Sequence, residues 1–194
     1  MSRVINEVTK ESIDQGKPNP YFSIWFNPSK TINAILAGEV KYNFLIPYLI
    51  LSLSGGITSA LKSQEELAFT IVTGIFVFAG ILLMVSVIYP AIIYGIGKLW
   101  KGESTYQEVR LIISLSFIPY IILWTLDLFP LLYPWISFNT SAAILNIITW
   151  IFSVRILLIG LTKVQKFSMM YAVLNYALPA LFVAILYGGF KFLK

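Results

Sequence analysis

The stretch LAFTIVTGIFVFAGILLMVSVIYPAIIYGIG, residues 67–97, decides the fold, because its 31 consecutive residues include no charged side chain. A helix rises about 1.5 Å per residue, so roughly 20 apolar residues cross a hydrocarbon core of about 30 Å. Four further uncharged stretches meet or approach that length: residues 42–61, 111–126, 128–154 and 167–190. The pattern predicts an all-α integral membrane bundle of five transmembrane helices.

Composition supports the same fold class. Hydrophobic residues make up 58% of the 194-residue chain and charged residues 12%, whereas soluble domains carry about 25% charged residues. Cys and His are absent, which excludes disulfides, thiol nucleophiles, imidazole bases and every zinc, haem or iron–sulfur site built on those ligands. We expect no metal and no cofactor. The net charge of +5 is attributed to loops that face lipid headgroups and not to nucleic-acid binding.

Basic residues orient the bundle. The predicted spans are Asn43–Leu61, Leu67–Gly97, Leu111–Phe129, Ser141–Leu161 and Tyr171–Phe190. The six flanks of these spans carry, in chain order, 5, 1, 3, 0, 2 and 2 Lys or Arg residues. Because basic residues favour the cytoplasmic side, the N-terminus and the second and fourth loops are predicted to be cytoplasmic. The C-terminus is then outside, and the protein is a multi-pass protein of the plasma membrane.

The first 41 residues precede the bundle, whose domain comprises residues 42–194. Residues 1–18 are predicted to be a mobile cytoplasmic tail, and residues 19–41 an interfacial region. There, Asn27 and Pro28 mark a helix start and Gly38 marks its end. Apolar residues lie on one face of this helix and polar residues on another: Ile32, Ile35 and Leu36 against Lys30 and Asn33. The helix is predicted to lie on the inner leaflet; the alternative is a loop packed under the bundle.

Aromatic residues mark both predicted membrane surfaces. Trp25 and Trp100 are candidates for the inner belt, and Tyr133 and Trp135 for the outer belt. The basic, aromatic segment 98–103 at the inner surface is predicted to contact lipid headgroups or a partner. Small residues predict close helix packing at Gly55–Gly56, Gly74 and Gly80.

Four prolines form the most distinctive candidate site. Pro47, Pro90, Pro119 and Pro179 fall in four spans, each about 6 to 12 Å from the cytoplasmic end. A proline inside a helix removes one backbone hydrogen bond, so the four predict a kinked inner half and a cavity open to the inner leaflet. The alternative is that membrane helices simply tolerate them. Pro47 and Pro119 share the contexts FLIPYLIL (44–51) and SFIPYIIL (116–123).

Two ionisable residues, Asp127 and Arg155, lie within predicted spans. Burying a charged side chain in the bilayer costs free energy, so ionisable residues there are treated as functional candidates. Asp127 is placed about 24 Å above the cytoplasmic start of its span, and Arg155 about 9 Å from the cytoplasmic end of its own. They are therefore predicted to occupy opposite leaflets. The structural alternatives are that Arg155 reaches the inner headgroups and that Asp127 reaches outer water or caps a helix.

Three segments resemble the YIP family of Ypt/Rab-interacting membrane proteins in its bacterial branch. They are NPYFSIWFNPSKTINAIL (19–36), GKLWKGESTYQEVRLIISLSFIPYII (97–122) and GLTKVQKFSMMYAVLNYALPAL (160–181). The resemblance implies five spans with a cytoplasmic N-terminus. The Asp-Leu-Tyr-Gly-Pro stretch of the Rab-binding eukaryotic members is absent, and residues 87–90 are the nearest piece. Bacterial relatives are associated with ABC-type exporters that protect against antimicrobial peptides.

Two functions therefore compete. The first is a non-enzymatic scaffold or accessory subunit of a transport, trafficking or antimicrobial-peptide resistance system, with a partner such as an ABC-type transporter or a second copy of the chain. The alternative is a small transporter or lipid-handling protein that uses the inner-leaflet cavity. An intramembrane enzyme is the weakest reading, because the sequence contains no catalytic set.

Overall fold

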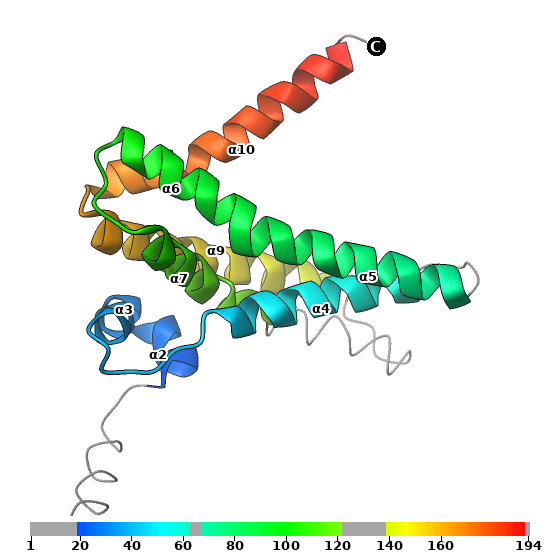
Figure 1. Ribbon diagram of the computed structural model, residues 1–194, viewed down its shortest axis with the longest axis horizontal. Coiled ribbons are helices and arrows are strands. Elements are labelled where there is room, and N and C mark those ends of the chain that lie inside the picture. The colour runs from blue at the N-terminus through cyan, green and yellow to red at the C-terminus, as the bar shows by residue number, and fades with distance from the viewer. Residues whose placement is uncertain (1–18, 63–66, 122–138, 193–194) are drawn as a thin grey trace, which may run out of the picture. The chain divides into compact units, whose positions relative to one another are not determined.

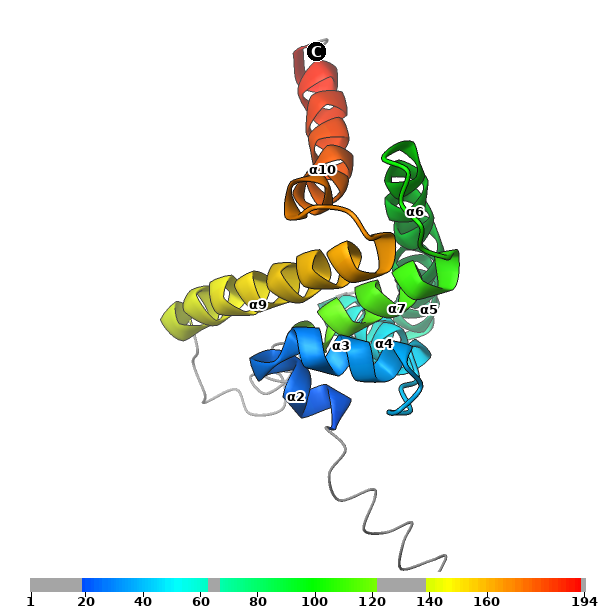
Figure 2. The same cartoon turned by 90° about the vertical axis from the view of Figure 1, so that its left-hand side faces the viewer.

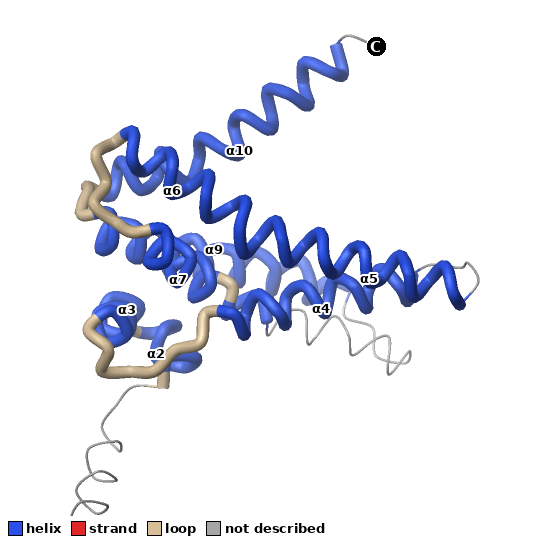
Figure 3. The backbone as a smooth tube through the Cα atoms, in the orientation of Figure 1, coloured by secondary structure: helices blue, strands red, loops and turns tan. Residues whose placement is uncertain are grey.

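The computed structural model describes residues 19–62, 67–121 and 139–192. Every regular element in these ranges is a helix, and Figure 3 shows no strand among them. The chain divides into two compact units, residues 1–43 and 44–194. The predicted tail and the predicted outer-belt residues Tyr133 and Trp135 lie outside the described residues.

The first unit contains two short helices, α2 (Pro20–Phe26) and α3 (Pro28–Leu36). The sequence analysis missed α2, whose start is capped by the Asn19 side chain, which accepts from the backbone N–H of Tyr21 at 3.0 Å. The predicted bounds of α3 are confirmed: Asn27 occupies the cap position, and Gly38 follows the helix with φ +73°. However, the Asn27 side chain makes no capping hydrogen bond.

The predicted polar and apolar faces of α3 are largely confirmed. Ile32 and Ile35 are buried, and Lys30 and Asn33 are exposed. Leu36 is 38% exposed and does not join the buried face. The side chain of Thr31 joins the two helices, because its hydroxyl donates to Ser23 Oγ at 2.9 Å.

The second unit begins with a helical hairpin of α4 (Leu45–Lys62) and α5 (Leu67–Leu83), which lie side by side in Figure 1. The small residues predicted to allow close packing do so at one crossing. A Cβ on Gly56 would lie 2.8 Å from the carbonyl oxygen of Gly74. Nothing lies within 4 Å of a Cβ added to Gly80, so the prediction is confirmed for Gly56 and Gly74 and wrong for Gly80.

The helix of α5 continues through a π-helical segment, η1 (Met84–Ile88), into α6 (Tyr89–Leu99). Together they form the long helix predicted from the opening stretch, and the π-helical segment immediately precedes Tyr89 and Pro90. Within the described residues, two helices are long and apolar enough to cross a membrane, Phe69–Leu99 and Ala143–Gln165. Five spans therefore stay a prediction.

The helix α7 (Tyr106–Ser116) covers the first part of the predicted third span, whose last residues, 122–129, lie outside the described residues. It begins five residues before the predicted start at Leu111 and is interrupted at Phe117, with a new helical turn at residues 118–121. Its eleven residues are too short to cross a membrane. Six of them are buried: Val109, Ile112, Ile113, Ser114, Leu115 and Ser116. The start of the predicted third span is thus buried in the second unit, and the span as a whole stays a prediction.

Two long helices complete the second unit, α9 (Asn139–Gln165) and α10 (Met169–Phe192). They contain the predicted fourth and fifth spans and extend each by a few residues. α7 packs along α9 (Figures 1 and 2), where a Cβ on Gly160 would collide with Ile112. The start of α10 contacts both α6 and α9.

Candidate functional site

The four prolines occupy different helical contexts: two lie in the first turn of a helix, and Pro90 and Pro179 lie within long helices. Pro47 is the third residue of α4, and Pro119 is the second residue of the turn after the Phe117 break. Pro90 follows η1 at the start of α6, whereas Pro179 lies inside α10. The predicted kinks at Pro47 and Pro119 are wrong, because a proline in the first turn of a helix removes no intrahelical hydrogen bond.

The two segments of similar sequence both begin helices that contact the buried α7 region. At the start of α4, the Phe44 carbonyl accepts from Ser114 Oγ at 2.6 Å, and Tyr48 Oη donates to the Arg110 carbonyl at 2.6 Å. At the Phe117 break, the carbonyl of Ser116 accepts from Ser153 Oγ at 2.6 Å. Side-chain hydroxyls thus satisfy carbonyls at helix breaks, as buried backbone groups require.

The π-helical segment widens the long helix just before Pro90. Pro90 has no N–H to donate to the carbonyl four residues earlier, and the N–H of Tyr89 bonds to the carbonyl of Met84. The hydroxyl of Tyr106, on α7, donates to the carbonyl of Val87 at 3.1 Å. π-Bulges occur frequently at functional sites, and the residues of this one line a pocket.

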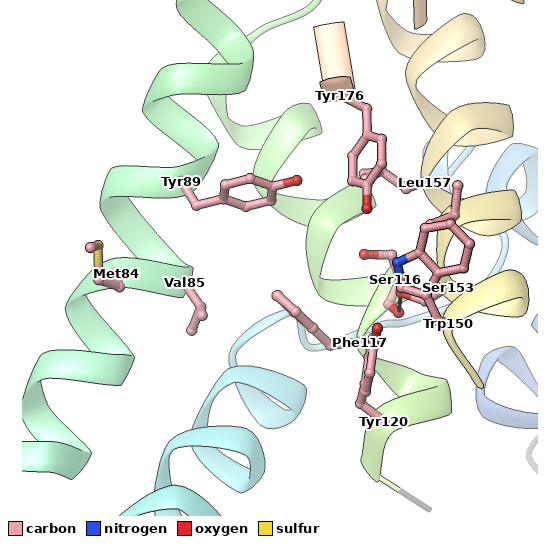
Figure 4. A pocket seen from close by; sticks show the side chains of 11 residues that line it. Met84, Val85, Tyr89, Ser116, Phe117, Tyr120, Trp150, Ser153, Leu157 and Tyr176 are labelled. Carbon is pink, nitrogen blue, oxygen red and sulfur yellow. Dashed lines mark hydrogen bonds between the residues drawn. The ribbon is translucent and has the colours of Figure 1, made fainter. Parts of the chain in front are cut away.

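The pocket, of about 380 Å³, lies between η1, the end of α7, the turn that follows it, α9 and α10. We call it the tyrosine pocket, because three of its lining residues are Tyr89, Tyr120 and Tyr176. Its other lining residues are Met84, Val85, Ser116, Phe117, Trp150, Ser153, Val154 and Leu157. In Figure 4 the phenol of Tyr89 points toward the ring of Tyr176, whose hydroxyl points toward Ser116 and Ser153.

None of the four predicted prolines is among the residues that line this pocket, but three lie close in sequence to its tyrosines. Pro90 adjoins Tyr89, Pro119 adjoins Tyr120, and Pro179 lies three residues beyond Tyr176. Pro47 is more remote: its neighbour Tyr48 packs edge-on against the lining residue Phe117, with ring centroids 6.0 Å apart. A cavity formed by the four prolines and open to the inner leaflet therefore stays a prediction.

The remaining predicted residues do not join the pocket. Arg155 is exposed on α9, and Asp127 lies outside the described residues. Trp25 lies on α2 in the first unit. Within the described ranges, no group of three or more His, Cys, Asp or Glu side chains is placed to hold a metal ion.

A second feature is a junction of two loops and the helix ends beside them, residues 97–105 and 165–171, which we call the loop platform. The side chain of Gln165 is 1% exposed and fits against two glycines. A Cβ on Gly97 or on Gly102 would collide with the Gln165 amide. Both polar atoms of that amide are buried without a hydrogen-bond partner in the described part of the chain.

Three contacts join the two loops of the platform. The N–H of Glu103 donates to the carbonyl of Gln165 at 3.1 Å, and Lys166 Nζ lies 2.5 Å from Glu103 Oε2. The hydrogen bond to Glu103 and its negative charge raise the pKa of Lys166. Trp100 packs on Tyr171 with ring centroids 5.2 Å apart, so the predicted belt residue contacts α10.

Two lysines in the platform adopt a backbone conformation that usually belongs to glycine. Lys101 has φ +60° and Lys166 has φ +55°. At the end of α6, the N–H of Gly102 donates to the carbonyl of Gly97 at 2.9 Å, which places Lys101 at the left-handed position that ends many helices. For a residue with a Cβ this conformation costs about 1–2 kcal/mol.

Sequence reasoning missed the tyrosines and Gln165. The tyrosines carried a signal, because each lies beside or near a proline that was identified, but aromatic residues are common in membrane spans. Gln165 carried no such signal, because the glycines that its side chain packs against are more than 60 residues away in the chain.

Residues 22–190 match a family model, the Yip1 domain. No curated protein and no solved structure gives a significant match to the chain.

Proposed function

The chain belongs to the Yip1 domain family of membrane proteins, and from that premise we propose that it is a non-enzymatic accessory subunit or scaffold. It would serve a membrane transport, trafficking or antimicrobial-peptide resistance system in the plasma membrane. In this proposal five helices span the bilayer, and the loop platform faces the cytoplasm, as the basic-residue count predicts.

The observation that carries the proposal is the strained Lys101 on the loop platform. Glycine at this position would avoid the cost of the left-handed backbone, yet the chain has a lysine whose side chain is exposed. Strain that persists on a well-fixed surface is a reason to infer a functional side chain. The neighbouring Leu99 is 78% exposed and Met170 is 71% exposed, so the platform offers apolar and basic groups together.

A membrane partner with an acidic cytoplasmic loop fits this surface. A basic group attracts it, and exposed apolar side chains lose contact with water when it binds. An ABC-type transporter is the partner that the resemblance suggests, and a second copy of the chain is the other option.

The test compares the complexes formed by tagged variants purified from native membranes in mild detergent. Lys101→Gly relieves the backbone strain and removes the charge, so it should keep or raise the melting temperature while reducing the stoichiometry of a co-purifying transporter. Lys191→Gln removes one positive charge from the side of the membrane predicted to be outside. It should change neither the melting temperature nor the stoichiometry of the co-purifying transporter. A stoichiometric complex that Lys101→Gly leaves intact would contradict the proposed role of the platform.

The tyrosine pocket favours a second candidate function, lipid handling. Its volume of about 380 Å³ falls within the range of roughly 300–1,000 Å³ that small-molecule sites occupy. This candidate expects the purified protein to retain a stoichiometric lipid, which native mass spectrometry measures. A lipid-free protein in which no added lipid binds saturably would rule it out.

A further inference from the structure

The polar groups of the tyrosine pocket are of two kinds. The serine hydroxyls are already engaged: Ser153 Oγ donates to the carbonyl of Ser116, and Ser116 Oγ donates to the carbonyl of Ile113 at 2.7 Å. The phenol hydroxyls of the three tyrosines have no hydrogen-bond partner in the described ranges. The pocket therefore offers unused O–H donors within a wall that is otherwise apolar.

No charged side chain lines the pocket among the described residues. The nearest candidate along α9 is Arg155, two residues after the lining residue Ser153. Successive residues of a helix are about 100° apart, so Arg155 projects from the opposite side of α9, where it is exposed. An anionic headgroup inside the pocket would thus lose its hydration without gaining a counter-charge, which is costly.

The mouth of the pocket opens toward the surface of the helix bundle. Met84 is 56% exposed and Trp150 is 51% exposed, and both are lining residues. They belong to the two helices that are long and apolar enough to cross a membrane. A ligand would therefore enter from the hydrocarbon region of the bilayer.

We propose that the tyrosine pocket binds a neutral lipid, one without any charged headgroup, that carries a carbonyl oxygen beside its hydrocarbon chain. The phenol hydroxyls donate to the carbonyl, and the apolar wall accepts part of the chain. This inference rests on lipid handling, the second candidate function, and adds the class of lipid. A neutral carbonyl lipid has two sources in a membrane: an ester lipid such as diacylglycerol, or an isoprenoid quinone.

The experiment uses the full chain in phosphatidylcholine nanodiscs and follows its tryptophan fluorescence. The quenchers are dioleoylglycerol with brominated acyl chains, a long-chain ubiquinone and brominated phosphatidylglycerol, titrated separately. At least one neutral quencher should act saturably, and the quencher that does so identifies the source. Phosphatidylglycerol should show no saturable component.

Variants that lose one hydroxyl test the recognition. A net hydrogen bond corresponds to a change of about fivefold in the dissociation constant, so Tyr89→Phe and Tyr176→Phe should each weaken neutral-lipid binding by about that factor. Tyr171→Phe is the matched control, because Tyr171 lies on the same helix as Tyr176 but packs on Trp100 outside the pocket. It should leave the binding unchanged.

The outcomes separate the inference from the function on which it rests. Saturable binding that both Phe variants leave unchanged, or that is strongest for phosphatidylglycerol, overturns the neutral-carbonyl inference but keeps lipid handling. Absence of saturable quenching by every lipid overturns both. If the Phe variants do not yield monodisperse protein, Val85→Phe fills the mouth without removing a hydroxyl. It should abolish saturable quenching, and retention of quenching would place the lipid elsewhere.

Discussion

At the scale of single residues, glycines set how closely the elements of the second unit approach. Gly97 and Gly102 leave room for the Gln165 side chain, and Gly160 leaves room for Ile112. Each contact joins residues from different helices or loops, and interiors packed at crystal-like density cannot absorb an added methyl group without movement.

Gly97→Ala should destabilise the protein, because the new methyl group collides with the buried Gln165 amide. Overpacking of this kind costs about 1–3 kcal/mol. The melting temperature in detergent measures the effect. Gly95→Ala is the control on the same helix, where a Cβ meets nothing within 4 Å. Alanine stabilises a helix relative to glycine by roughly 0.5–1 kcal/mol, so Gly95→Ala should be neutral or stabilising. An equal loss of melting temperature in both variants would refute the close packing of Gly97 against Gln165.

At the scale of elements, the start of α7 depends on a capping box. Thr105 Oγ1 accepts from the backbone N–H of Glu108 at 3.3 Å, and Glu108 Oε2 accepts from the N–H of Thr105 at 2.6 Å. This reciprocal pair satisfies two N–H groups that a helix start leaves unpaired. It explains why α7 begins at Tyr106 and not at the start of the uncharged run.

Thr105→Ala should loosen the first turn of α7, since loss of an N-cap costs about 0.5–2 kcal/mol. Hydrogen exchange of the amides at residues 106–109 should become faster. Gln107→Ala, at an exposed position of the same turn, serves as the control and should leave exchange slow. Unchanged exchange in Thr105→Ala would mean that packing alone holds this turn.

The α4–α5 hairpin depends on one small-residue crossing. A Cβ on Gly74 would lie 3.1 Å from the Cβ of Ala60. This is close to the Cβ–Cβ distance of roughly 3.5–4.5 Å in a disulfide. The chain has no cysteine of its own. Ala60→Cys with Gly74→Cys should therefore cross-link on oxidation, which blocks labelling by a maleimide polymer. Adding Gly56→Leu should abolish the cross-link, whereas adding Gly80→Leu should not. Cross-linking that survives Gly56→Leu would contradict the crossing.

The sequence predicted the long helices well and the interrupted one badly. The predicted spans place α4, the α5–α6 helix, α9 and α10 within a few residues of their bounds, because hydrophobic length is read directly from the chain. It was wrong about the start of α7, because the charged residues Glu108 and Arg110 lie inside the helix, and it missed the break at Phe117. The tyrosine pocket depends on contacts between distant helices, which no local pattern encodes.

At the scale of the whole molecule, the account depends on which side of the membrane each loop occupies. The loop platform has basic residues and belongs, in our proposal, to the cytoplasmic side. The loops predicted to lie outside carry one basic residue or none. The orientation also decides whether the tyrosine pocket is reached from the inner leaflet. A chain without cysteine permits a direct measurement, since every introduced thiol is unique.

That measurement is labelling of single-cysteine variants in intact cells with a membrane-impermeant maleimide. One variant is made in each flank of the predicted spans: Ser2, Ser63, Gln107, Ser137, Ser168 and Lys194. Five spans with a cytoplasmic N-terminus predict labelling at Ser63, Ser137 and Lys194, and protection of the other three until the cells are permeabilised. Protection of Lys194 together with Ser2, or labelling of Gln107 from outside, would contradict the account.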